Sequence, residues 1–274
     1  MNKTEIKTAR LTLRPLTDEY LKTAHEYASD LENTRYMCYL PNETESETLD
    51  FLRHAGEEWE KPSPEFYEFA IIWDGHHIGA VSLAIGEGAG AGELGWIINK
   101  KYWRQGFATE AASALICFAR SLGVRRLCAH CDAENTGSYR TMEKLGMKFV
   151  GRYPGRKNRC SDEERDELEY GLTLPERVKI TAVRASRYDD LIEKYENPIE
   201  HACDISVGDV FYTDGERPGS LCAEAWATME PFVSVLLRGG GNFFDGWMRD
   251  PHSAMVSCND GFRPVSFYIE AIYE

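Results

Sequence analysis

A strand, a glycine-containing loop and a helix follow one another in Glu93-Leu94-Gly95-Trp96-Ile97-Ile98-Asn99 and Tyr102-Trp103-Arg104-Gln105-Gly106-Phe107-Ala108-Thr109-Glu110-Ala111. The first segment is rich in apolar residues, which predicts a strand over residues 93–100. Gly106 and Ala108 are small, so backbone N–H groups of the loop can approach a ligand closely. The helix expected from about Thr109 adds unpaired N–H donors and a partial positive charge. The loop is therefore suited to hold a pyrophosphate, although the same pattern also occurs in ordinary turns.

Hydrophobic periodicity predicts a mixed α/β fold around this segment. Thr17-Asp18 is expected to cap the helix that follows the first strand. Asp74-Gly75 is a hairpin turn signal between two strands. The expected strands are residues 10–16, 66–73, 77–85, 93–100, 126–132, 148–153 and 167–174, and the expected helices are residues 19–29, 46–60, 109–122 and 138–145. The fold class that we expect is a mixed α/β sheet flanked by helices.

The pattern breaks at Leu174-Pro175-Glu176-Arg177, and a new strand starts at Val178. We therefore expect two domains, residues 1–175 and residues 176–274, and 274 residues suffice for two hydrophobic cores. The second is expected to be a smaller α+β domain. Its expected strands are residues 178–183, 207–212, 255–257 and 265–272, and its expected helices are residues 188–195 and 223–237.

Composition excludes several classes of protein. The formal net charge of −14 disfavours nucleic-acid binding, so no nucleic-acid partner is expected. No apolar run reaches the ~18 residues of a membrane helix, and no membrane association is expected. The first residues lack the apolar core of a secretory signal, and eight cysteines without such a signal indicate reduced thiols. We expect a cytoplasmic protein.

Three segments in order resemble the GNAT superfamily of acetyltransferases, in particular its ribosomal-protein N-acetyltransferase-like branch. They are Ala9-Arg10-Leu11-Thr12-Leu13-Arg14-Pro15-Leu16, the segment from Glu93 to Ala111, and Asn135-Thr136-Gly137-Ser138-Tyr139-Arg140-Thr141-Met142-Glu143-Lys144-Leu145-Gly146-Met147. The resemblance covers about residues 8–174, and three segments in the family's order are more specific than any one of them.

The resemblance implies a GNAT-like fold, acetyl-coenzyme A as the co-substrate, and a role for each matching residue. Glu93 is the implied base that deprotonates the amine, and Ser138 or the adjacent Tyr139 is the implied proton donor to the departing thiolate. The backbone of Trp96, Ile97 and Ile98 would pair with the pantetheine arm, on a strand splayed from residues 126–132. The remaining implied cofactor-binding residues are Arg104, Gln105, Gly106, Phe107, Ala108, Thr109 and Asn135.

The sequence departs from the family's pattern at four positions, one of which, Met147 in place of the usual Phe, is a packing change. Trp103 and Arg104 stand where the family more often has Gln or Arg and Gly, which makes the loop bulkier. Met142 stands where many members carry the tyrosine that acts as the general acid. Other interpretations also remain open. Glu93 can be a solvent-facing carboxylate, Ser138 can cap its helix, and Asn135 can shape only a turn.

The implied reaction is acetyl transfer to a primary amine, either a protein N-terminus or a small molecule, by direct attack on the thioester. Two alternatives stay open, namely a transferase of a different acyl-CoA and a non-catalytic CoA-sensing module with the C-terminal domain as its output. The acidic stretch Glu43–Glu60 lies where family members build the acceptor groove, but it also fits a solvated helix face. The sequence leaves the oligomeric state open, a dimer included.

No metal is expected. Cys128 and Cys131 stand three apart on a strand, so their side chains point to opposite faces and cannot share an ion. In the second domain, His201, Cys203, Cys222 and Cys258 have ligand types that suit zinc but lack close Cys-x-x-Cys spacing, and buried free thiols are the preferred interpretation.

The second domain resembles a small prokaryotic domain family of unknown function. The resemblance rests on the run from Cys258 to Phe267, with Cys222-Ala-Glu-Ala-Trp226 upstream. Asp260 and Arg263 are expected to form an ion pair that fixes a hairpin. Phe243-Phe244 and Trp247-Met248 fit either a core or an interface.

Overall fold

The computed structural model of the protein describes residues 4–86, 88–200 and 203–273. His201, one of the zinc-type residues considered above, lies outside them. The chain divides into two compact units, Met1–Thr173 and Leu174–Glu274. None of the helices in the described part of the chain combines the length and the apolarity that crossing a lipid bilayer requires.

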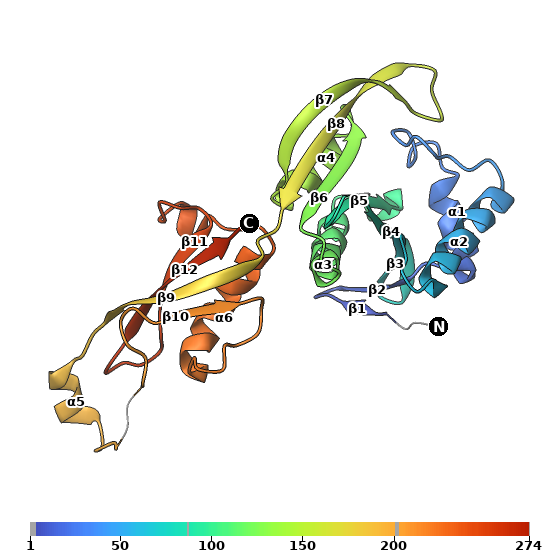
Figure 1. The fold of residues 1–274 in the computed structure, drawn as a ribbon. Helices are drawn as coiled ribbons and strands as arrows, with labels where there is room; N and C mark the ends of the chain where they lie inside the picture. The colour runs from blue at the N-terminus through green and yellow to red at the C-terminus, as the bar shows by residue number, and fades with distance from the viewer. Residues whose placement is uncertain (1–3, 87, 201–202, 274) are drawn as a thin grey trace. The chain divides into compact units, whose positions relative to one another are not determined.

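The first unit is built on an eight-stranded sheet in the order β1-β2-β3-β4-β5-β6-β8-β7 (Figure 1). Every neighbouring pair is antiparallel except β5 and β6, which run parallel. The expected mixed α/β class is confirmed. The strands are β1 (Ile6–Lys7), β2 (Leu11–Pro15), β3 (Phe66–Trp73), β4 (His76–Ile85), β5 (Ala91–Ile98), β6 (Arg126–Asp132), β7 (Lys148–Lys157) and β8 (Glu164–Thr173).

Helices cover both faces of this sheet, because successive strand residues point to opposite sides. Ala70 of β3 belongs to a buried cluster with Tyr27 of α1 and Leu52 of α2. The next residue back, Phe69, packs edge-to-face on Phe118 of α3, with ring centroids 5.3 Å apart. The helical segments are η1 (Asp18–Tyr20), α1 (Leu21–Ala28), α2 (Glu45–Glu60), η2 (Lys100–Tyr102), α3 (Phe107–Ser121) and α4 (Thr136–Lys144).

The observed boundaries differ from the predicted ones at a few helix and strand ends. Thr17 does not act as a side-chain cap, and the helix after it opens with the short 3-10 segment η1. In contrast, the Thr44 side chain accepts a hydrogen bond from the N–H of Glu47 and starts α2. Strands β7 and β8 extend beyond the predicted ranges, because each satisfies the other's backbone along a long hairpin whose polar sequence gives no strand signal.

The second unit packs α6 on a four-stranded antiparallel sheet in the order β10-β9-β12-β11. Met229 and Val233 of α6 are fully or almost fully buried in one cluster with Ile180 of β9 and Phe267 of β12. The elements are β9 (Arg177–Ala185), α5 (Asp189–Tyr195), β10 (Val210–Thr213), α6 (Ala223–Leu237), η3 (Phe243–Asp245), β11 (Ser253–Ser257) and β12 (Val265–Ile272). The expected smaller α+β domain is confirmed.

The expected ion pair between Asp260 and Arg263 is wrong. The Arg263 guanidinium instead donates two hydrogen bonds of 2.6 Å to the carboxylate of Glu196, which follows α5. Asp260 accepts the backbone N–H groups of Phe262 and Arg263, as a turn residue does. The pairing therefore ties the β11–β12 hairpin to the end of α5, which only the tertiary fold brings near.

Candidate active site

Strands β5 and β6 form a fork at the centre of the first sheet. Their parallel pairing runs from Ala91 opposite Arg126 to Glu93 opposite Cys128, where it ends. Strand β5 nevertheless continues to Ile98, and it stays paired with β4 along its other edge over that length. The β6-facing edge of residues 94–98 therefore offers backbone donors and acceptors to an extended ligand chain. Trp96, Ile97 and Ile98 belong to this stretch of β5, and their contact with a pantetheine arm stays a prediction.

The carbonyl of Ile98 is already engaged, because it accepts a 2.7 Å hydrogen bond from the indole Nε1 of Trp103. Trp103, one of the departures from the family pattern, thus folds back on the end of β5. This contact fixes the path of the chain from the strand to the loop that follows.

Loop 104–106 brings the N-terminus of α3 beside the open edge of β5. Arg104 and Gly106 both have left-handed backbone conformations, with φ of 63° and 81°. The helix begins at Phe107, two residues before the predicted Thr109, with Gly106 as its N-cap and without a side-chain cap. The N–H groups of the first turn lack partners within the helix, so Phe107, Ala108 and Thr109 present an anion-binding terminus. Residues 103–106 are exposed and accessible to a ligand.

Arg10 of the N-terminal segment braces this loop, which the sequence did not indicate. Its Nη1 donates to the carbonyl of Gln105 at 3.0 Å, its Nε pairs with Glu110 at 2.6 Å, and its guanidinium lies 4.6 Å from the ring centroid of Phe107. Burial favours the neutral form of Glu110, but hydrogen bonds from Thr8 and Arg10 hold the pKa of that carboxyl below its ordinary value. A carboxylate in the first helical turn would repel a phosphate, and Arg10 compensates its charge.

Glu93 stands at the vertex of the fork. Its Oε1 lies 2.9 Å from Nδ1 of His130, two residues beyond Cys128 on β6. The hydrogen bond that His130 donates to the Glu93 carboxylate raises the pKa of His130, against the effect of partial burial. Ile97 packs against the buried cluster formed by α1 and α2. Because Glu93 and Ile97 are four residues apart on the same strand, their side chains lie on the same face of the sheet. His130 was not predicted as a site residue. Its position two residues after Cys128 on a predicted strand indicates only that the two side chains share a face.

On the opposite face of β6, the side chain of Cys131 lies beside α4. Cys131 is buried, and its thiol is in hydrogen-bond contact with Ser138. Asn135 caps α4, since its Oδ1 accepts the N–H of Ser138 at 3.1 Å. The interpretation of Ser138 as the helix cap is therefore wrong, and that of Asn135 as a turn residue is supported. Ser138 and the adjacent Tyr139 are both partly exposed, whereas Met142 is fully buried in the core.

The connection between α1 and α2 is bridged to the tip of the β7–β8 hairpin on the Glu93 side. The Arg159 N–H donates to the carbonyl of Met37 at 3.0 Å, and its guanidinium pairs with Glu47 at 3.0 Å. The Arg156 guanidinium donates to the carbonyl of Tyr36 at 3.1 Å. Figure 1 shows these two loops approaching each other above the sheet. The bridge thus joins the connection that follows α1 to the β7–β8 hairpin.

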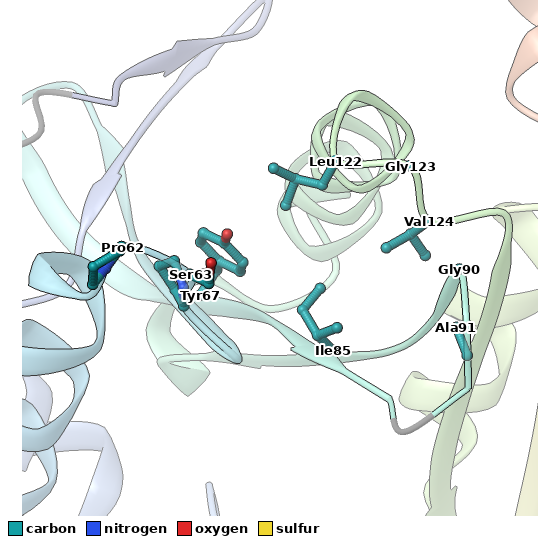
Figure 2. A pocket seen from close by; sticks show the side chains of 10 residues that line it. Pro62, Ser63, Tyr67, Ile85, Gly90, Ala91, Leu122, Gly123 and Val124 are labelled. Carbon is teal, nitrogen blue, oxygen red and sulfur yellow. The ribbon is translucent and has the colours of Figure 1, made fainter.

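Two surface hollows accompany this unit. One of about 290 Å³ is lined by Tyr67, Ile85 and Ala91 from the sheet and by Leu122 and Val124 beyond α3 (Figure 2). Since Ala91 and Ile98 are the two ends of β5, about 23 Å apart in an extended strand, this hollow lies at the closed end of the fork. It is therefore separate from the loop that begins α3.

The other hollow, of about 420 Å³, lies at the end of β6. It contains Asp132, whose carboxylate Arg165 binds through Nε and Nη2. Arg165 also pairs with Glu134 at 2.6 Å. Arg165 thus pairs with two of the carboxylates of this hollow, Asp132 and Glu134.

Cys128 and Cys131 diverge as expected, with Cys131 buried and Cys128 partly exposed. On the exposed face, however, ligand atoms of Cys128, His130 and Glu93 lie within 4.8 Å of one another. Burial and the charge of Glu93 raise the pKa of Cys128 to about 11. The thiol therefore keeps its proton at neutral pH, and the direct Glu93–His130 hydrogen bond is the dominant contact of the three groups.

Residues 10–148 match the acetyltransferase (GNAT) domain family. The uncharacterised N-acetyltransferase YnaD of Bacillus subtilis is 31% identical over 152 residues, which are 53% of this chain and 84% of that protein. The crystal structure of a GNAT-family acetyltransferase from Bacillus anthracis superposes with a TM-score of 0.54 at 29% identity, over 62% of this chain and 98% of that one. The coenzyme A complex of RimL, a ribosomal L7/L12 α-N-protein acetyltransferase, has a TM-score of 0.56 at 17% identity, over 62% and 98% of the two chains, and shares the fold alone.

The fork, the loop at the start of α3 and these similarities define the class of protein as an acyltransferase. The chain belongs to the GNAT acetyltransferase family. The second unit begins at Leu174, beyond the matched residues 10–148.

Proposed function

We propose that the first unit transfers an acetyl group from acetyl-coenzyme A to a primary amine, with Glu93 accepting the proton of the amine. The observation that carries the proposal is the position of Glu93 at the vertex of the β5–β6 fork, beside the open strand edge that an extended pantetheine chain fits. The uncapped N-terminus of α3 supplies the complementary anion site.

The residues of the chain have separate roles in this proposal. Arg104 to Thr109 hold the pyrophosphate through backbone N–H groups, and the edge of β5 at Trp96 and Ile97 holds the pantetheine arm. Asn135, at the start of α4, holds the far end of that arm. Much of the acceleration comes from alignment of the two substrates.

An alkylammonium ion cannot attack a thioester until it has lost a proton. Glu93 takes that proton, and the amine lone pair then forms the new C–N bond at the carbonyl carbon. A backbone N–H of β5 near Ile97 stabilises the negative oxygen that develops. When the C–S bond breaks, Ser138 or Tyr139 protonates the thiolate and regains a proton from the cationic nitrogen of the intermediate, so that the products are a neutral amide and free coenzyme A.

The acceptor enters on the α1–α2 side of the sheet, because Glu93 faces that side. The bridge from Arg159 to Met37 and Glu47 limits the width of the opening. This enclosure favours a slender aliphatic amine, or the first residue of a flexible N-terminus, over an amine on a folded surface. The carboxylates of Glu167 and Glu169 on β8 help to raise the pKa of His130, and their negative charge also favours a cationic acceptor.

Release of coenzyme A thiol, measured over a panel of aliphatic amines and N-terminal peptides, tests the proposal. We expect amine-dependent release by the wild-type chain and a loss of about 100-fold in Glu93→Gln. Equal release from propionyl-coenzyme A would point to a broader acyltransferase. Tight acetyl-coenzyme A binding without amine-dependent release would contradict the enzyme assignment and support a CoA sensor.

A further inference from the structure

A carboxylate, a thiol and an imidazole meet at the vertex of the β5–β6 fork. Glu93 and Cys128 are register partners where the parallel pairing ends, and His130 follows Cys128 by two residues on β6. One ligand atom from each of the three side chains lies within 4.8 Å of the other two. In the described part of the chain, no other group of three or more His, Cys, Asp and Glu side chains brings its ligand atoms this close together.

The backbone holds these three groups on one face of the sheet. Cys128 and His130 are two residues apart on a strand, so their side chains point to the same side. Strand β6 is paired with β5 along one edge and with β8 along the other. The thiol of Cys128 is directed toward β5, since its sulfur lies 3.7 Å from the carbonyl oxygen of Gly92. Ligands on paired strands are arranged in advance, and only their side chains need to adjust.

The distances between the ligand atoms suit a small tetrahedral ion. Zinc bonds of about 2.0–2.3 Å place neighbouring ligand atoms roughly 3.3–3.6 Å apart in a tetrahedron. Glu93 Oε1 and His130 Nδ1 are 2.9 Å apart, so they would separate by about half an ångström around an ion of this kind. The Cys128 sulfur would approach by about an ångström at most. Rotation of exposed side chains provides shifts of this size.

The exposure and the charge of the cluster also favour a divalent cation. The side chains of Glu93 and His130 are 52% and 27% exposed, so an ion can enter and can keep a water ligand. Glu169 of β8 is the register partner of His130 and adds negative charge beside the cluster. Binding releases the thiol proton of Cys128, and any proton on the coordinating nitrogen of His130, to the solvent. One carboxylate and one thiolate then balance the two charges of the ion.

We propose that Glu93, Cys128 and His130 bind Zn²⁺ through one oxygen, one sulfur and one nitrogen, with water in the fourth position. Zinc accepts such a mixed set of ligands, whereas Mg²⁺ and Ca²⁺ require oxygen ligands. The bound ion occupies the carboxylate that takes the proton of the amine, and it therefore inhibits acetyl transfer. This inhibition rests on the proposed function of Glu93, but binding of the ion does not.

Titration of the metal-free full-length chain with Co²⁺, without any amine, tests the binding itself. We expect one ion per chain and a sulfur-to-cobalt charge-transfer band, which Zn²⁺ then abolishes. Cys128→Ser should remove the band, and both Cys128→Ser and His130→Asn should weaken Zn²⁺ binding by more than the roughly 10- to 100-fold that loss of an outer hydrogen-bond partner costs. The matched controls Cys160→Ser and Cys203→Ser, each of which removes an exposed thiol, should keep the band.

A band that persists in Cys128→Ser, or that disappears in either control, would overturn the zinc site. Thermal unfolding of the metal-free variants checks that they fold. Zn²⁺ should raise the melting temperature of the wild type and of both controls by more than that of Cys128→Ser.

Amide formation, measured by mass spectrometry because Zn²⁺ also binds free coenzyme A thiol, tests the inhibition. The half-inhibiting Zn²⁺ concentration should rise by more than about 10-fold in Cys128→Ser and stay the same in Cys160→Ser. Equal inhibition of wild type and Cys128→Ser would contradict the assignment of the inhibitory site. A cobalt band in a chain that acetylates no amine would support the metal site and contradict the proposed function.

Discussion

The Oε1 atom of Glu93 and the Nδ1 atom of His130 lie 2.9 Å apart across the point where β5 and β6 separate. The two groups come from different strands, and each is on the face that α1 and α2 cover. A carboxylate in contact with an imidazole can share or pass on a proton. The pair is therefore the centre of the proposed proton transfer, and it makes the role of Glu93 testable through its partner.

Glu93→Gln should lower kcat by about 100-fold near neutral pH, because the amide cannot accept a proton. Part of the activity should return at higher pH, as more of the substrate is present as free amine. Rate–pH profiles of wild type and variant measure both effects. Asp166→Asn, which removes a surface carboxylate paired with Arg152 on the same sheet, is the control. An unchanged profile in Glu93→Gln would remove this residue from the mechanism.

In His130→Asn, the amide should keep a polar contact to Glu93, but the titrating imidazole is lost. The raised pKa of His130 means that the folded state holds this proton more tightly than the unfolded state. The stability from the pair is thus fully present below about pH 6.5, the ordinary pKa of histidine, and it is lost as the pH rises through the raised pKa. Glu93, Glu167 and Glu169 all contribute to that shift.

Urea unfolding of wild type and His130→Asn, each at about pH 6 and about pH 8, measures this difference. The wild-type advantage should be only about 0.2–1 kcal/mol at the lower pH, because both side chains are partly solvated, and smaller at the higher pH. The acid limb of the activity profile should move to lower pH in the variant, since no imidazolium then competes for the carboxylate. An advantage that grows with pH would contradict the pairing.

Gly106→Glu should raise the KM for acetyl-coenzyme A by 10-fold or more, because the new carboxylate would lie in the proposed anion site at the start of α3. The left-handed φ of 81° also strains any side chain at this position. Gly123→Glu is a matched control, since Gly123 has a φ of 85° just beyond the other end of the same helix. If both variants bind coenzyme A equally well, loop 104–109 does not hold the pyrophosphate.

Arg10→Ala should weaken coenzyme A binding although Arg10 lies about 100 residues from the loop in sequence. Its loss frees the carbonyl of Gln105 and leaves the charge of Glu110 uncompensated beside the phosphates. The double variant with Glu110→Gln should recover part of the affinity. Calorimetric titration of the four proteins gives the coupling energy, for which we expect about 0.5–3 kcal/mol. Strict additivity would show that Arg10 acts independently of Glu110.

Glu68 should make the first unit less stable as the pH rises. Burial raises the pKa of this carboxyl from 4.5 to about 8. Between these values the folded state holds a proton that the unfolded state has released, so the free energy of unfolding falls by at most about 1.4 kcal/mol per pH unit. Glu68→Gln should remove this slope, whereas Glu65→Gln, at an exposed neighbouring position, should keep it. Denaturant unfolding across this pH range measures the slope.

Most elements of the fold could be predicted because their local signals are strong. The turn signal Asp74-Gly75 and the helical spacing of α3 and α6 each agree with the observed elements. The polar hairpin of β7 and β8 was predicted too short, because its strands are held by each other rather than by an apolar face. The pairing of Arg263 with Glu196 was missed for a related reason, since the partners are 67 residues apart.

The sequence by itself determined the class of the first unit and predicted the donor side of its site, because an apolar strand, a loop with Gly106 and a helix start are local features within about twenty residues. Tertiary structure alone decided the meeting of Glu93 with His130, of Arg10 with Gln105, and of Arg263 with Glu196. Each of these contacts joins segments whose distance depends on strand order and register. Such contacts arise only when the fold brings the segments together, and spacing along the chain does not give the partner of each residue.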